Sequence, residues 1–125
     1  MHEPSMAESV KKPKKVDHLN LEEIVHLANK VGMEYVHSKA LAEKFSLFKA
    51  TEKSKAMQRY DDGIRSEAKI KRLAETDKEY LDFLEQLAQA KASSEKLRIR
   101  YESYLNLFEA KRSLLSYQKA EMSLL

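Results

Sequence analysis

The 125-residue sequence contains no cysteine and no tryptophan, and it has only two glycines and two prolines. Without cysteine the chain can form no disulfide, no thiolate metal site and no cysteine nucleophile. So few turn residues argue against a β-sandwich or a barrel. No apolar run approaches the roughly 20 residues of a transmembrane helix, and the first ten residues lack the apolar stretch of a signal peptide. We therefore expect a cytoplasmic protein without membrane association.

The residues that are present favour long helices. Charged residues make up 34% of the chain and hydrophobic residues 42%, a balance typical of long helices and coiled coils. Residues 1–17 hold both prolines, the lysine-rich run 11–15 and few large apolar residues. Such a segment cannot offset its ordering entropy. The sequence therefore predicts a disordered basic tail over 1–17 and one helical region over 18–125.

A capping box marks the start of the first helix, because Asn20 is followed three residues later by Glu23. From Leu21 onward apolar residues recur at steps of three and four, which predicts a helix over 21–73. The run Asp-Asp-Gly at 61–63 allows a kink there, or a break that would give a compact bundle of three helices. We favour continuation or a mild kink, because the helical period of apolar residues persists through this run.

A second capping box, with Thr76 at the cap and Glu79 three residues later, predicts another helix over 77–122. Two helices joined near Thr76 form an all-α, coiled-coil-like antiparallel hairpin. A hairpin buries only one stripe per helix, and the aromatic residues exceed what one seam needs, so we expect a dimeric four-helix bundle. The residues predicted for this partner or oligomer seam are Tyr35, Phe45, Phe48, Tyr101, Tyr104, Phe108 and Leu115. The apolar C-terminal residues Met122, Leu124 and Leu125 suggest docking against a partner.

The charges are distributed unevenly along the chain. Residues 39–72 carry 10 basic and 5 acidic groups, whereas residues 73–95 carry 2 basic and 6 acidic groups. Two interpretations stay open. The two segments lie near each other across the hairpin and pair as solvated faces, or the basic side chains form a strip that contacts nucleic-acid phosphates. The residues of this basic strip are Lys44, Lys49, Lys53, Lys55, Arg59, Arg65, Lys69 and Arg72.

Two Glu-x-x-His spacings, Glu23 with His26 and Glu34 with His37, match the spacing found in di-iron helical bundles. In such bundles the two motifs come from different helices, whereas here they lie on one helix, about 16 Å apart. A di-metal bundle is therefore a remote alternative, and we expect no metal and no cofactor.

Nothing in the sequence supports catalysis. The two glycines are isolated, which excludes a glycine-rich phosphate loop. No serine sits in a nucleophile elbow beside a paired base. The sequence therefore predicts no catalytic residue and a protein that is not an enzyme.

The segment 74–113 begins with Ala-Glu-Thr-Asp-Lys-Glu-Tyr and ends with Phe-Glu-Ala-Lys-Arg-Ser, around heptad-like apolar spacing. In this segment the chain resembles small helical accessory proteins encoded by phages and prophages, found among recombination or replication genes. The resemblance covers about a third of the chain, implies an accessory role in DNA metabolism, and brings no catalytic residue. The residues that carry it are Ala74, Asp77, Tyr80, Leu87, Ala90, Leu97, Tyr101, Glu102, Phe108, Glu109, Arg112 and Ser113.

The sequence thus predicts a non-catalytic interaction protein, of phage origin if the resemblance holds, that forms homo-oligomers. Its basic strip would bind nucleic acid or a nucleoprotein complex. The alternative is a structural or adaptor protein that binds a protein partner by helical packing.

Overall fold

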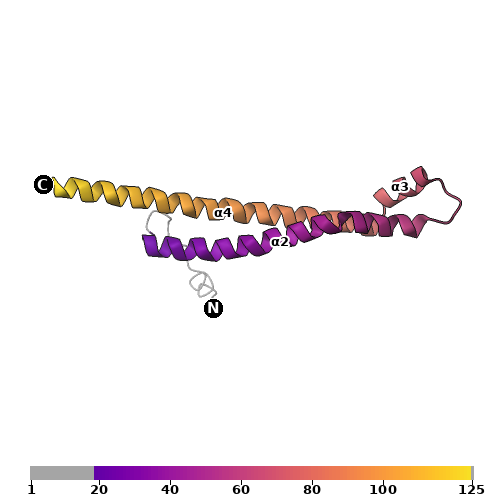
Figure 1. Cartoon of the computed structure of the whole chain (residues 1–125), viewed down its shortest axis with the longest axis horizontal. Helices are drawn as coiled ribbons and strands as arrows, with labels where there is room; N and C mark the ends of the chain where they lie inside the picture. Colours follow the sequence, from indigo (N-terminus) through magenta and orange to yellow (C-terminus); the bar gives the residue numbers. More distant parts are fainter. Residues whose placement is uncertain (1–18, 125) are drawn as a thin grey trace, which may run out of the picture.

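The structure is a computed structural model that describes residues 19–124. Within this range it consists of three helices and no strand: α2 (Leu21–Tyr60), α3 (Glu67–Glu75) and α4 (Lys78–Ser123). Figure 1 shows α2 and α4 side by side and antiparallel, with α3 beside the far end of α2. The predicted all-α antiparallel hairpin is therefore confirmed. The tail predicted over 1–17 lies outside the described residues.

The predicted capping box at the start of α2 is present. The Asn20 side-chain oxygen accepts a hydrogen bond from the Glu23 backbone N–H at 2.8 Å, and the Asn20 backbone N–H donates to Glu23 Oε1 at 3.1 Å. Two of the N–H groups that a helix start leaves without partners are thus satisfied by side chains. This local chemistry fixes the first residue of α2 at Leu21.

The predicted helix over 21–73 is wrong beyond Tyr60, because a loop over 61–66 separates α2 from α3. In this loop Asp61 Oδ1 accepts from the Gly63 N–H, and Asp62 Oδ1 accepts from the N–H groups of Ile64 and Arg65. Aspartate oxygens thereby replace helical acceptors. Gly63 has φ of 77°, a left-handed conformation that other residues adopt only at a cost. The chain therefore reverses direction here and not near Thr76.

Thr76 also has a different role from the one predicted. It is the C-cap of α3, and its hydroxyl donates to the backbone carbonyls of Arg72 and Leu73 at 3.3 Å. The N-cap of α4 is Asp77, whose carboxylate accepts from the Tyr80 N–H at 2.9 Å. Residues 76 and 77 thus separate two helices that both run antiparallel to α2 (Figure 1). The start of α4 lies one residue from the predicted position.

The three helices meet in a small core near the tip of the hairpin. Ala56 from α2, Ala74 from α3 and Tyr80 from α4 are buried together, with Met57 and Leu84 packed against them. Alanine side chains let the short α3 approach α2 closely, so a helix of only nine residues is held by packing. This cluster does not extend into the compact three-helix bundle considered as an alternative, because α3 ends at Glu75.

The seam between α2 and α4 follows the steps of three and four expected of a coiled coil. Two aromatic pairs cross it: the rings of Tyr35 and Tyr101 stack at 6.4 Å, and those of Phe45 and Phe83 meet edge to face at 5.8 Å. Phe48, which we predicted for the partner or oligomer seam, is 47% exposed and lies outside the α2–α4 seam. The buried and half-buried apolar residues of the seam are Ile24, Ala28, Val31, Tyr35, Ala42, Phe45, Ala56, Tyr80, Phe83, Leu87, Ala90, Leu97, Tyr101, Tyr104 and Phe108.

Gly32 faces the ring of Tyr101 across this seam. A Cβ at position 32 would stand 2.9 Å from Tyr101 Cε1 and 3.2 Å from Cδ1. The missing side chain therefore makes room for an aromatic ring, which then stacks on Tyr35. This close approach offsets the usual cost of glycine inside a helix, about 1 kcal/mol relative to alanine.

We expect the substitution Gly32→Ala to have opposite consequences in two backgrounds. In a Tyr101→Ala chain, where no ring opposes the new methyl group, it should raise the free energy of unfolding by about 1 kcal/mol through helix propensity. In the wild-type chain the ring must move off its stack, and overpacking of this kind costs roughly 1–3 kcal/mol. Urea unfolding followed by circular dichroism measures both effects, and equal effects in the two backgrounds would contradict this role of Gly32.

Candidate functional site

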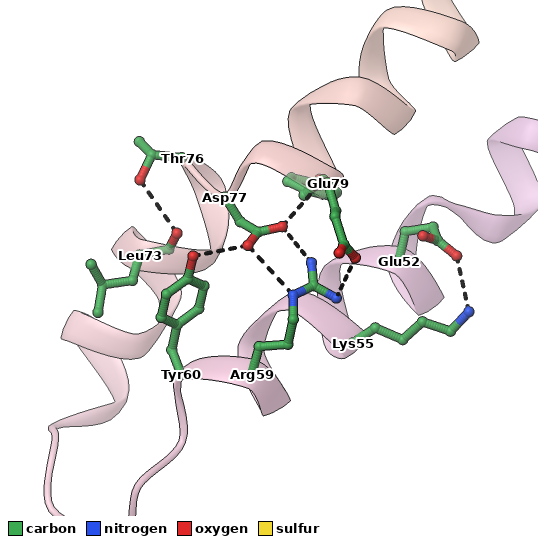
Figure 2. A network of polar contacts seen from close by, with 9 residues as sticks. Glu52, Lys55, Arg59, Tyr60, Leu73, Thr76, Asp77 and Glu79 are labelled. Carbon is green, nitrogen blue, oxygen red and sulfur yellow. Dashed lines mark hydrogen bonds and ion pairs between the residues drawn. The ribbon is translucent and has the colours of Figure 1, made fainter.

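Asp77 holds the start of α4 against the end of α2. Figure 2 shows its carboxylate between Arg59 and Tyr60 of α2. Arg59 forms an ion pair with Asp77 and a second one with Glu79 at 3.2 Å, and the Tyr60 hydroxyl donates to Asp77 Oδ1 at 2.8 Å. Together with the N–H of Tyr80, these donors surround the carboxylate of Asp77, and Asp77 is only 7% exposed. Asp77 therefore acts at once as helix cap and as interhelical partner.

The same contacts shift the acidity of three groups. The guanidinium of Arg59, followed by the N–H of Tyr80, lowers the pKa of Asp77 to about 2. The hydrogen bond to Asp77 raises the pKa of Arg59 and also that of the Tyr60 hydroxyl. Because these donors bind the ionised carboxylate, they favour its charged form. The cluster is thus a stable charged contact, fully formed near neutral pH.

Half of the predicted basic strip is engaged in ion pairs. Lys53 pairs with Glu75 at 3.2 Å, Lys55 with Glu52 at 3.2 Å, and Arg65 with Asp62 at 3.8 Å. Together with Arg59, four of the eight strip residues are bound to carboxylates. The pairs of Lys53 and Arg59 join the basic segment 39–72 to the acidic segment 73–95, as the first of the two charge interpretations predicted.

The other four strip residues, Lys44, Lys49, Lys69 and Arg72, make no ion pair with the residues that the structure describes. They do not form one row. At 3.6 residues per turn, Lys44 and Lys49 are separated by about 140° around the axis of α2, and Lys49 and Lys55 by about 120°. Lys55 in turn lies only about 20° from Lys44, so the strip residues of α2 spread over about half of the helix circumference.

An open groove lies beside the region where α2, α3 and α4 meet. Residues 46–51 of α2 are all exposed. Ser46, Lys49 and Ala50 line an open groove of about 610 Å³ together with Tyr80 and Leu84 of α4. The polar groups at its edge, Lys53 and Glu75, are bonded to each other. The groove is thus a gap in helix packing, and among its polar lining residues Lys53 and Glu75 already bind each other.

The last part of α4 lies beside no other helix of the described residues 19–124. Figure 1 shows α4 running past the beginning of α2, and every described residue from Arg112 onward is exposed. We call residues 112–124 the α4 extension. It includes Leu115, which we predicted for the partner or oligomer seam and which is 51% exposed. The large apolar residues that it exposes are Leu114, Leu115, Tyr117, Met122 and Leu124.

Among residues 19–124 no group of three or more histidine, aspartate and glutamate side chains is placed to hold a metal ion. The two predicted Glu-x-x-His spacings lie along α2 alone, as the sequence indicated. Within the same range, no helix has the length and apolar content that crossing a membrane requires.

Two features of these surfaces were missed by reasoning from the sequence. The first is the pairing of Asp77 with Arg59, which joins residues 18 positions apart and so has no signal in the local sequence. The α4 extension was indicated only by its apolar C-terminal residues. Its boundary near Arg112 depends on which residue of α4 lies beside the first residue of α2. The capping box at Asn20 sets that first residue, and the position of the reversal sets which residue of α4 lies beside it.

Replacing Asp77 by asparagine should remove the ion pair while keeping a side-chain acceptor for the Tyr80 N–H. Because the folded-state pKa lies near 2, below the usual value of 3.8, the ionised carboxylate stabilises the fold above about pH 4 and this contribution disappears as the pH falls toward 2. The wild-type chain should therefore unfold at higher urea concentration than Asp77→Asn at pH 7, and the difference should close near pH 2.

The matched control is Asp82→Asn, which replaces an exposed aspartate on α4 that makes no ion pair with described residues. This control should follow the wild-type profile between pH 7 and pH 2. A constant difference between the wild-type chain and Asp77→Asn across this range would show that the charge of Asp77 does not hold the junction.

Comparisons with known proteins add no relative. A scan against models of protein families found no match, and searches of curated proteins and of solved structures returned no similar chain. The resemblance of residues 74–113 to phage accessory proteins therefore stays a prediction.

Proposed function

We propose that this chain is a non-catalytic helical adaptor that binds a protein partner through the α4 extension. One observation carries the proposal: residues 112–124 continue α4 beyond the other helices of the described range 19–124, and they expose five large apolar side chains. Exposed apolar surface on this scale typically marks a site of protein interaction.

The extension has the physical character of one half of a helical interface. An isolated helix of this length is marginal in water, because most helices in proteins gain their stability from packing. The extension would therefore gain stability from a partner. A partner helix laid along it would remove Leu115 and Met122 from water and complete the pairing that α2 provides further along. Recognition of this kind needs apolar anchors at helical spacing.

The remaining polar clusters favour a structural role over a reactive one. Arg59, Tyr60 and Asp77 donate to and accept from one another at the junction, and they hold α2 against α4. Their groups are satisfied within the cluster and line no enclosed cavity with a reactive side chain. The chemistry they support is the fixing of one helix to another.

Site-specific photo-crosslinking tests the proposal in living cells. A benzophenone amino acid at position 115 should form an adduct with a second polypeptide, identified by mass spectrometry, whereas the same group at position 47 should not. Leu47 is a suitable control because it is an exposed leucine, 79% accessible, that lies on α2 away from the extension. Absence of a polypeptide adduct at position 115 would contradict the proposal.

Nucleic-acid binding is the second candidate, favoured by the four strip residues that make no ion pair with described residues. A helix that carries positive charge over half of its circumference attracts phosphates without reading base sequence. The ion pairs of the other four strip residues weaken this candidate, because an acidic side chain already neutralises each of them.

A pair of matched variants tests the second candidate. If phosphates bind here, Lys44→Gln with Lys49→Gln should weaken binding of a labelled oligonucleotide at low salt by roughly tenfold or more. Lys53→Gln with Lys55→Gln, which removes equal charge from paired positions, should weaken it less. Affinity measured by fluorescence anisotropy should fall steeply with added salt. Equal losses in the two variants, or binding insensitive to salt, would exclude this surface.

A further inference from the structure

The α4 extension continues a seam that is covered elsewhere along the same helix. Every seventh residue of α4 from Tyr80 lies at the same seam position. The first five members of this series are buried or half-buried beside α2, whereas the last two are 51% and 72% exposed. The series consists of Tyr80, Leu87, Ser94, Tyr101, Phe108, Leu115 and Met122.

The change from covered to exposed has a simple geometric cause. The seam position itself keeps its period and its apolar character from Tyr101 through Met122, so α4 presents the same face throughout. What changes is the neighbouring helix, because α2 begins at Leu21 and Figure 1 shows α4 continuing beyond that point. The seam of the extension therefore continues the interface that α2 covers along the rest of α4.

We propose that the exposed seam of the extension is covered by the α4 extension of another copy of this chain, paired antiparallel about a two-fold axis. This inference rests on the proposed function and names the partner. It predicts an elongated dimer in which the two hairpins point away from each other and the two extensions overlap at the centre.

Continuity with the α2–α4 seam points to an antiparallel helix at this position. Along its covered part α4 accepts a helix that runs antiparallel to it (Figure 1). A second α4 extension that enters antiparallel runs in the direction of α2 and continues its line. It also carries apolar residues at the same seven-residue spacing. A two-fold pairing covers both extensions at once, so the assembly closes as a dimer without leaving a further copy of the face exposed.

The length of the extension sets the register of the pair. Residues 112–124 span about 18 Å at 1.5 Å per residue, so the axis of a full overlap passes near Gln118. Gln118 lies fourteen residues after Tyr104 and thus on the seam. Its amide both donates and accepts, so two copies meeting at the axis satisfy each other. A single polar pair of this kind fixes the register of a helical interface.

In this register the end of each extension also contacts the hairpin of the other copy. Leu115 of one copy lies within one turn of Met122 of the other. The tip of each extension then reaches the beginning of α2 in the other copy. There Leu19, His26 and Leu27 line a depression of about 400 Å³. The contact therefore extends beyond the two extensions onto the hairpins themselves.

Solution mass measured by sedimentation equilibrium tests the inference on the full chain. The wild-type chain should give twice the monomer mass of 14.5 kDa, and the double variant Leu115→Asp with Met122→Asp should give the monomer mass. The control Leu47→Asp, an equally drastic change at an exposed leucine of α2, should remain dimeric. Because Leu47, Leu115 and Met122 are all exposed within the described residues 19–124, all three proteins should keep the same circular dichroism spectrum.

Single cysteines test the direction of the pair, since the natural chain contains none. Gln118→Cys, near the axis, should form a disulfide between copies under mild oxidation. Met122→Cys should not, because antiparallel pairing about position 118 separates the two residues by about 12 Å along the axis, beyond the roughly 7 Å between Cα atoms that a disulfide allows. Efficient bonding at position 122 would indicate parallel helices and overturn the antiparallel arrangement.

A monomer at every concentration, or a dimer that survives Leu115→Asp with Met122→Asp, overturns the inference about a second copy. The photo-crosslink at position 115 then separates this failure from failure of the proposed function. An adduct with a different protein would leave the adaptor function intact. An adduct with residues 1–18 of the same chain would overturn both, because the face would be covered from within.

Discussion

Two antiparallel helices can cover each other only over the length that they share. In this chain α2 has 40 residues, and the returning arm has 9 residues in α3 and 46 in α4. The return is therefore longer than the helix it pairs with. Once the chain has reversed at residues 61–66, some of α4 must continue past the start of α2. The exposed apolar face of residues 112–124 follows from this difference in length.

Asp77 determines which residues meet along the shared length. It begins α4 as its N-cap and is bonded in the same place to Arg59 and Tyr60 at the end of α2. A helix whose first residue is held to its neighbour has little freedom to slide, because each step along the seam would separate this cluster. The position of the Tyr101 ring against Gly32, more than twenty residues further along α4, is set by this anchor together with the steps of the seam.

The sequence predicted the features that depend on neighbouring residues. The capping box at Asn20 and the apolar period of α4 are local, and the structure places the helix starts at Leu21 and Lys78. The reversal was mistaken because apolar residues keep the helical period through 61–66, although Ile64 ends up exposed. There the side chains of Asp61 and Asp62 accept hydrogen bonds from the loop N–H groups in place of helical carbonyls, and Gly63 adopts a left-handed conformation. Ion pairs between distant residues, such as Arg59 with Asp77, exist only once the chain has reversed.

The two ends of the hairpin differ in what they offer to another molecule. At the tip, the polar side chains bond within the chain: Asp61 and Asp62 accept loop N–H groups, and Arg59 joins Asp77. A partner binding there would have to replace contacts that already exist. At the other end, Leu115 and Met122 lie on a part of α4 with no described neighbour, so a partner that covers them replaces no contact with a described residue. The larger gain in free energy from association is therefore available at the end of α4.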